Sequence, residues 1–243
     1  MWCSKVAYFS PRTRCPTRDV DLSASHLSND LDSVRALIDD ILAEPREDGW
    51  VYGASAAEAI REGDVYSGVR VTVPCALARA RIVFHVDVNI GDVIWPSPTT
   101  VSLPRLLSDA TIEVPGYSLS MIIAETLVTA VQRGTANTRW RDFADVYMMT
   151  GKHAVRALEV RESIRLVALH RHATLAPLST VWVGLAALAQ NRWAAWIRKQ
   201  NLVDRLPVAF DTVISANQDF GDPLMTQSDS DLHWDPQTRR WRS

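Results

Sequence analysis

The sequence predicts an α+β fold whose N-terminal half contains strands and whose C-terminal half is helical. In several segments between residues 17 and 103, apolar and polar residues alternate with the two-residue period of strands. From residue 118 onward, apolar residues recur at helical spacing and strand signals are few. We therefore expect an α+β half over residues 1–115, a helical half over residues 116–225 and an irregular tail over residues 226–243.

Three strands are expected in the N-terminal half before residue 91. The first covers residues 17–22, and its two-residue period places Asp19 and Asp21 on one face, opposite the apolar residues. The second, at residues 69–73, alternates in the same way. The third, at residues 82–90, has only apolar residues on one face. Its polar face carries His85, Asp87 and Asn89.

Two helices are also expected in this half. The first runs from about residue 30 to 43 with an amphipathic stripe, and Asn29 is its expected N-cap. The second is short: it opens at the capping-box pattern Ser55–Glu58 and ends at Gly63. Residues 91–104 contain three prolines and are expected to form a loop with one edge strand.

The C-terminal half is a succession of expected helices. Residues 118–133 are apolar at helical spacing, Gly134 ends that segment, and residues 139–149 form the next helix. Further helices are expected at residues 153–172, 179–200 and 208–220. In the tail, Trp234 and Trp241 are expected to attach the chain end to the body of the protein.

Composition and charge exclude several classes of protein. Apolar residues make up 47% and charged residues 22% of the chain, the balance of a soluble globular protein. A net charge of −2 excludes a globally basic nucleic-acid binder. The three cysteines show no zinc-site spacing and no disulfide framework. Because no apolar run approaches the ~20 residues that span a bilayer, and no signal peptide is recognisable, we expect a cytoplasmic protein with no membrane contact.

Motifs of three common enzyme classes are absent from the sequence. There is no Gly-x-Ser-x-Gly turn, no Gly-x-x-x-x-Gly-Lys phosphate loop, and no His-x-x-x-His or Glu-x-x-His spacing. These absences disfavour a hydrolase with a catalytic triad, a P-loop NTPase and a zinc enzyme.

Asp19 and Asp21 form the first candidate site. Carboxylates two residues apart on a strand leave the same face, which suits them to hold Mg²⁺ ions that bridge nucleotide phosphates. Asp87, on the polar face of a later strand, would supply a third carboxylate. Asp-x-Asp alone is a weak motif, since residues 30/32 and 229/231 repeat it, so a chance occurrence is the alternative.

The second candidate cluster lies on the helix at residues 139–149. Arg139 or Arg141 is suited to contact nucleotide phosphates, and Asp142 to act as a base or an orienting carboxylate. Arg141 and Asp145 are four residues apart and can pair on a helix, so a salt-bridged helix surface is the alternative. The aromatic residues of this helix are expected to pack and not to stack on bases.

Four segments, taken in order, carry a family resemblance. They are Pro16-Thr-Arg-Asp-Val-Asp-Leu22, His85-Val-Asp-Val-Asn-Ile-Gly-Asp92, Ile122-Ile-Ala-Glu-Thr126 and Arg139-Trp-Arg-Asp-Phe-Ala-Asp145. Together, over about residues 16–220, they resemble the nucleotidyltransferase toxins of the AbiEii/AbiGii type, which belong to the DNA-polymerase-β-like nucleotidyltransferase superfamily.

The resemblance implies a catalytic half with a mixed sheet and flanking helices, and Mg²⁺-dependent transfer of a nucleotide from an NTP to an acceptor. For several relatives that acceptor is tRNA. The resemblance also implies a toxin–antitoxin or abortive-infection operon with a separate antitoxin protein. Matched to the family motifs, the metal ligands are Asp19, Asp21 and Asp87 (or Asp92 in place of Asp87), the helix carboxylate is Asp142, and the nucleotide-binding positions are Thr126, Arg139 and Arg141.

Two departures from the family pattern both concern triphosphate binding. The family has a helix and a Gly-Gly or Gly-Ser turn before the Asp-x-Asp, whereas the first glycine of this chain is Gly49, so both are expected to be missing. Where the family commonly has Lys, this chain has Thr126. The departures favour a truncated or catalytically impaired relative that acts as a binding or regulatory protein. A nucleotidyltransferase for small molecules, of the antibiotic-modifying kind, is a further alternative.

Overall fold

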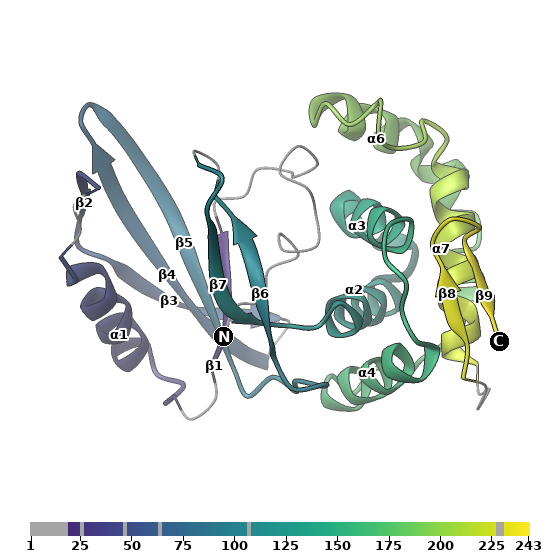
Figure 1. Ribbon diagram of the computed structural model, residues 1–243, viewed down its shortest axis with the longest axis horizontal. Helices are drawn as coiled ribbons and strands as arrows, with labels where there is room; N and C mark the ends of the chain where they lie inside the picture. Colours follow the sequence, from purple (N-terminus) through teal and green to yellow (C-terminus); the bar gives the residue numbers. More distant parts are fainter. Residues whose placement is uncertain (1–18, 25–26, 46–47, 63–64, 106–107, 227–230) are drawn as a thin grey trace. The chain divides into compact units, whose positions relative to one another are not determined.

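The computed structural model describes residues 19–24, 27–45, 48–62, 65–105, 108–226 and 231–243 (Figure 1). The described residues divide into two compact units. The sheet unit holds the residues up to Asp92 together with Thr99–Gly116, and the helical unit holds Val93–Pro98 and Tyr117–Ser243. The predicted α+β fold class, with a mixed sheet followed by helices, is confirmed. In the described part of the chain, every helix is too short or too polar to span a bilayer.

The sheet unit is built on a five-stranded mixed sheet. The edge strand β1 (Asp19–Ala24) runs parallel to β5 (Ala80–Ile90), which pairs antiparallel with β4 (Val65–Leu77). Strand β4 is long enough to pair along its other side with both β2 (Trp50–Tyr52) and β3 (Ala56–Glu62). The two-residue alternation of β4 and β5 gives this sheet one apolar and one polar face.

Helix α1 (Leu31–Ala43) covers part of the apolar face, where Val34 and Ile38 pack against valines of β4 and β5. Its N-cap is Asp30 and not the expected Asn29. The Asp30 carboxylate accepts a hydrogen bond from the backbone N–H of Ser33 at 2.8 Å, the geometry by which N-caps satisfy an unpaired donor of the first turn.

One expected element of the sheet unit is wrong, and another is found with a partner strand that was not expected. The short helix predicted from the pattern at Ser55 to Glu58 is wrong, because Ala56–Glu62 forms β3 along β4. A strand that is available for pairing over seven residues outweighs a local capping signal. The edge strand expected in the proline-rich loop is β6 (Thr99–Pro104), which pairs with β7 (Thr111–Gly116) in a separate two-stranded sheet.

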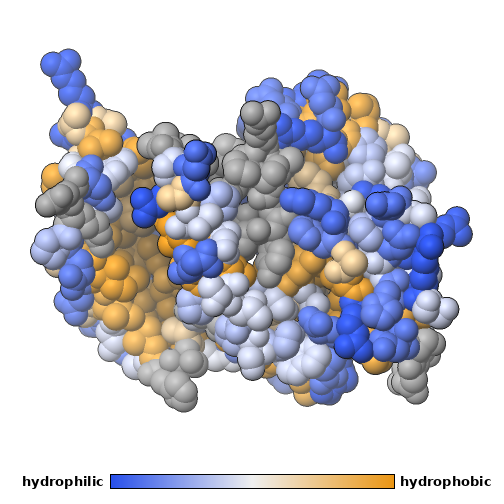
Figure 2. Space-filling view, in the orientation of Figure 1, coloured by the Kyte–Doolittle hydropathy of each residue, from blue (hydrophilic) through white to orange (hydrophobic). Residues whose placement is uncertain are grey.

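The sheet unit also leaves large apolar side chains exposed. They include Leu37 and Ile41 on α1 and Ile82 and Val83 on β5. The space-filling view shows apolar atoms gathered on one face of this unit (Figure 2).

The helical unit contains helices at or near the expected positions. They are α2 (Leu119–Arg133), α3 (Trp140–Thr150), α4 (Ala157–His170), the short α5 (Leu178–Val181), α6 (Leu185–Lys199) and α7 (Phe210–Met225). Helix α2 packs along α4, and α7 packs against α3 and α6. The core is aromatic: the Phe143 ring lies 5.3 Å from Phe210, which stacks on Trp193 at 4.9 Å. The expectation that the aromatic residues of α3 pack is confirmed for Phe143, which is buried.

The chain end is not an irregular tail. Strands β8 (His233–Asp235) and β9 (Arg240–Arg242) form an antiparallel hairpin, because the turn between them lets Trp234 and Trp241 pair across it. The indole N–H of Trp234 donates to the backbone oxygen of Thr150 at 2.7 Å, and that of Trp241 donates to Phe220 at 3.0 Å. The two tryptophans therefore attach the hairpin to the helices, as expected.

Candidate functional site

The polar face of the sheet carries a row of charged residues, one from each of four neighbouring strands. Asp21 of β1 lies opposite Asp87 of β5, and Asp87 lies opposite Arg70 of β4. Arg70 in turn lies opposite Glu58 of β3. Because paired residues of adjacent strands direct their side chains to the same face, the row runs carboxylate, carboxylate, guanidinium, carboxylate.

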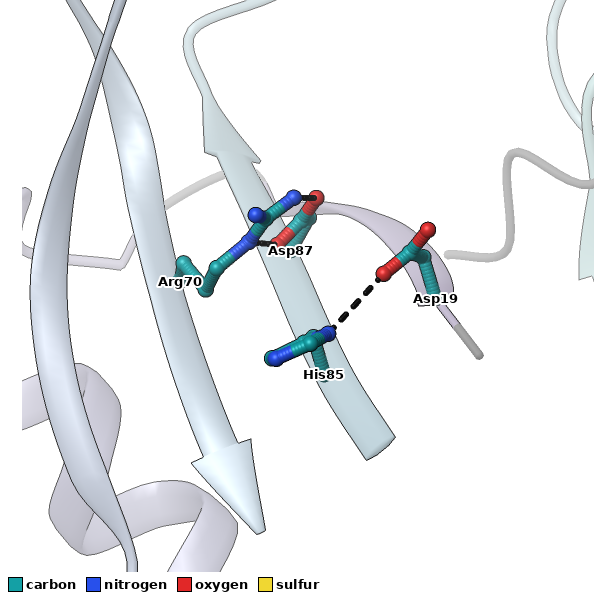
Figure 3. A network of polar contacts seen from close by, with 4 residues as sticks. All are labelled: Asp19, Arg70, His85 and Asp87. Atoms are coloured by element: carbon teal, nitrogen blue, oxygen red, sulfur yellow. Dashed lines mark hydrogen bonds and ion pairs between the residues drawn. The ribbon is translucent and has the colours of Figure 1, made fainter. Parts of the chain in front are cut away.

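Arg70 and Asp87 are joined by a bidentate ion pair (Figure 3). Arg70 Nε donates to Asp87 Oδ1 and Arg70 Nη2 donates to Asp87 Oδ2, both at 2.7 Å. The hydrogen bonds to Asp87, and then the charge of that carboxylate, raise the pKa of Arg70 further above its ordinary value. Asp87 is only 8% exposed, whereas the Arg70 side chain is 36% exposed, so the carboxylate is withdrawn from water and the guanidinium is partly solvated.

Asp19 lies one step along the same face, next to His85. The two side chains point toward each other, with His85 Nδ1 3.1 Å from Asp19 Oδ1 (Figure 3). The Asp19 side chain is 44% exposed, and Asp21 is exposed as well. Both aspartates thus leave the polar face of an edge strand where a solvent-borne ligand can reach them.

The three carboxylates predicted to hold a metal share one face but are not arranged as one metal site. Among the residues that the structure describes, no three or more His, Cys, Asp or Glu side chains are grouped so that they could hold a metal ion. Asp87 is hydrogen-bonded to Arg70, and the alternative residue Asp92 lies beyond the end of β5. The pair Asp19 and Asp21 is the part of the predicted set that remains accessible.

Arg70 is the site residue that motif reasoning missed. A signal for it was present, because the alternation Val69-Arg-Val-Thr-Val73 puts Arg70 on the polar face of its strand. Its contact with Asp87 depends on the register of two strands, which the local pattern does not contain.

In the helical unit, the candidate residues of α3 lie at the start of that helix. Asn137 Oδ1 accepts a hydrogen bond from the Arg139 backbone N–H at 2.9 Å, a local turn that leads the chain into α3. Arg139 Nε then lies 2.8 Å from Asp142 Oδ2. Asp142 and Asp145 are only 4% and 5% exposed, so a solvated, salt-bridged helix surface is the wrong description of these carboxylates.

Thr126 and Arg141 differ in how they are presented. The Thr126 hydroxyl donates to the backbone oxygen of Ile122 at 2.8 Å and is buried within α2, so it brings no charge to the site. Arg141 is partly exposed in the first turn of α3.

A small cavity lies between Thr126 of α2, Asp142 of α3 and Asn217 of α7. Asn137 Nδ2, Trp182 Nε1 and Asn217 Oδ1 belong to residues that line it, and they have no hydrogen-bond partner among the described residues. The cavity has a volume of about 10 Å³ and the atoms that face it are apolar, so it is not a site for a polar ligand.

Comparisons with known proteins identify a family for this chain. A family model described as the nucleotidyl transferase AbiEii toxin of a type IV toxin–antitoxin system matches residues 9–220. No curated protein sequence matches the chain. Two solved structures from Helicobacter pylori are similar. One is a candidate nucleotidyltransferase with 9% identity, covering 93% of this chain and 87% of that chain at a TM-score of 0.48. The other is JHP933, with 9% identity, covering 83% of this chain and 88% of that chain at a TM-score of 0.31.

Proposed function

The chain belongs to the AbiEii nucleotidyltransferase toxin family of type IV toxin–antitoxin systems, and from this premise we propose that it transfers a nucleotide from an NTP to an RNA acceptor, with tRNA as the acceptor class. The observation that carries the proposal is the pair of carboxylates, Asp19 and Asp21, on the polar face of an edge strand inside the matched region. An antitoxin is the partner that the family implies.

Asp19 and Asp21 are the residues that would hold Mg²⁺. They fit a cation shared with a ligand, because both leave one face of β1 and reach water. When bound, the ion would supply charge neutralisation to the triphosphate and to the departing pyrophosphate. Asp87 does not fit as a third ligand in the arrangement described, because both of its oxygens accept hydrogen bonds from Arg70.

In the helical unit, Arg139 is the residue that would contact a phosphate. Its side chain is 49% exposed, and its Nε lies 2.8 Å from Asp142, so the guanidinium is held at the surface, where a phosphate oxygen can reach it. Asp142 then acts as a positioning carboxylate, since its buried charge fixes the direction of the guanidinium. Arg141, two residues further on, is the second candidate for phosphate contact, whereas Thr126 contributes no charge.

The reaction proposed is a displacement at the α-phosphorus of the NTP. The acceptor hydroxyl oxygen forms a bond to that phosphorus, the bond to the bridging oxygen breaks, and pyrophosphate departs with its electron pair. The hydroxyl proton is released to solvent. The chain's own contribution is to hold the triphosphate against the polar face of the sheet and to orient it through fixed charges.

The test is transfer of each of the four α-labelled NTPs to total tRNA, comparing the unaltered chain with Asp21→Asn. Asp32→Asn is a matched control, because Asp32 belongs to another Asp-x-Asp pair, on α1. We expect label in RNA that is lost in Asp21→Asn, by about 10³-fold or more, and kept in Asp32→Asn.

Equal labelling by Asp21→Asn and the unaltered chain would contradict the proposal. Label found on a small hydroxyl compound and not on RNA would favour the small-molecule nucleotidyltransferase. Absence of label with all four NTPs would favour an impaired relative with a binding or regulatory role.

A further inference from the structure

We infer that Arg70 is a fixed internal cation of the polar face: it takes Asp87 as its own counter-ion, so that a divalent metal is bound through Asp19 and Asp21 and not through Asp87. This inference rests on the proposed function and concerns the metal part of the same site. It assigns a positioning role to a residue outside the family motifs.

The geometry of the pair is the first argument. Two hydrogen bonds of 2.7 Å join the guanidinium edge to both carboxylate oxygens of Asp87, and the residues are direct register partners on β4 and β5. The register of the two strands places these residues opposite each other. A planar guanidinium matched to a carboxylate in this way is the geometry that favours a lasting ion pair.

The charge of the row is the second argument. Asp21 and Asp87 are neighbours across two hydrogen-bonded strands, which lie about 4.8 Å apart. Two adjacent carboxylates at that spacing repel each other unless a cation lies close by. Arg70 supplies this cation permanently, because a guanidinium remains charged at any ordinary pH.

Competition for Asp87 follows from these two arguments. A divalent ion bound to Asp87 would either lie beside the Arg70 guanidinium, where like charges repel, or displace a bidentate pair whose carboxylate is buried. Asp19 and Asp21 lie on the far side of Asp87 from Arg70, at the sheet edge, so a cation bound there is more distant from the guanidinium.

The experiment measures Mn²⁺ affinity without nucleotide, by electron paramagnetic resonance of the free ion. In Arg70→Met, Asp87 loses its counter-ion and becomes available, so we expect Mn²⁺ to bind about tenfold more tightly, equivalent to about 1.4 kcal/mol. In Arg70→Met/Asp87→Asn, we expect an affinity within about twofold of the unaltered chain. Arg35→Met is the matched control, since it removes one positive charge from α1 of the same unit and should leave Mn²⁺ affinity unchanged.

Several outcomes would overturn the inference. One is an Arg70→Met affinity no higher than that of the unaltered chain. Another is a double variant that binds Mn²⁺ tenfold more weakly, because Asp87 would then be a ligand in the native protein. If Arg70→Met fails to fold, Arg70→Lys keeps the positive charge, and we expect its Mn²⁺ affinity to stay near that of the unaltered chain; a tenfold gain there would also overturn the inference.

Failure of this inference and failure of the proposed metal pair give different results. One outcome would overturn the inference and leave the proposed function intact: Asp21→Asn lowers the Mn²⁺ affinity, and no substitution of Arg70 changes it. Mn²⁺ affinity that is unchanged in Asp21→Asn would contradict the metal pair itself, whatever the Arg70 variants do.

Discussion

The sheet unit and the helical unit assemble their candidate residues by different physical rules. In the sheet unit each of four strands contributes one residue to a row, and the register of distant segments decides which charges meet. In the helical unit a single segment contributes all the candidate groups: the turn at Asn137, the guanidinium of Arg139 and the carboxylate of Asp142. Residues of α2 and α7 lie against this segment.

The two sites are therefore sensitive to different kinds of substitution. The row on the sheet depends on pairs of opposite charges, so that removing one member leaves its partner uncompensated. The α3 cluster depends instead on whether the aromatic core holds the helix in place, because its polar contacts are mostly between near neighbours in sequence. Substitutions in the core of the helical unit and in the charged row of the sheet unit test these two dependences separately.

The largest effect is expected from Phe143→Ala in the helical unit. The buried ring of Phe143 lies between Trp182, at 5.1 Å, and Phe210, at 5.3 Å, so its removal leaves a cavity in the core. We expect a loss of about 3–5 kcal/mol in the free energy of unfolding, measured by urea denaturation. Leu188→Ala is the control: this exposed residue of α6 should change the value by less than about 0.5 kcal/mol.

If Phe143→Ala cost no more than its control, the α3 cluster would not depend on the aromatic core. The contrast drawn between the two units would then be wrong for the helical unit.

A smaller effect is expected from the charged row of the sheet unit. Asp87→Asn leaves Arg70 without its counter-ion, and because Arg70 is partly exposed it regains some contact with water. We therefore expect a loss of about 1–2 kcal/mol in the free energy of unfolding. Adding Arg70→Met should restore part of that loss, since neither charge of the Arg70–Asp87 pair then remains. A double variant that is less stable than Asp87→Asn by a further 1 kcal/mol or more would show that Arg70 stabilises the sheet through its other contacts.

The same contrast explains how much could be predicted from the sequence. Strand alternation is a local property, and it correctly put Asp19, Asp21 and Asp87 on the polar sides of their strands. The register that brings Arg70 to Asp87 is not local, and the pairing of Ala56–Glu62 with β4 is not local either, so one contact was missed and one strand was taken for a helix.

For the helical unit, periodicity predicted where the helices lie but not which faces of them are covered. Asp142 and Asp145 look like members of a charged surface in the sequence, and they are buried because α3 packs against α2 and against α7, whose Phe210 contacts the α3 aromatic rings. Burial depends on the packing of several helices together, which helical spacing alone does not specify.

The smallest effect is expected at the start of α1, where the Asp30 cap is a contact between near neighbours in sequence inside the sheet unit. Hydrogen bonds from the Ser28 side chain and from Ser33 lower the pKa of Asp30 from 3.8 to about 2. A carboxyl whose pKa is lower in the folded state than in the unfolded state stabilises the fold above its unfolded value and loses that contribution as the pH falls toward the folded value. Asp30→Ala should therefore lower the thermal midpoint at pH 7, and the difference should shrink as the pH falls from 3.8 to about 2. Asn29→Ala should leave the midpoint unchanged at every pH; an equal loss in both variants would mean that the start of α1 is not set by the Asp30 cap.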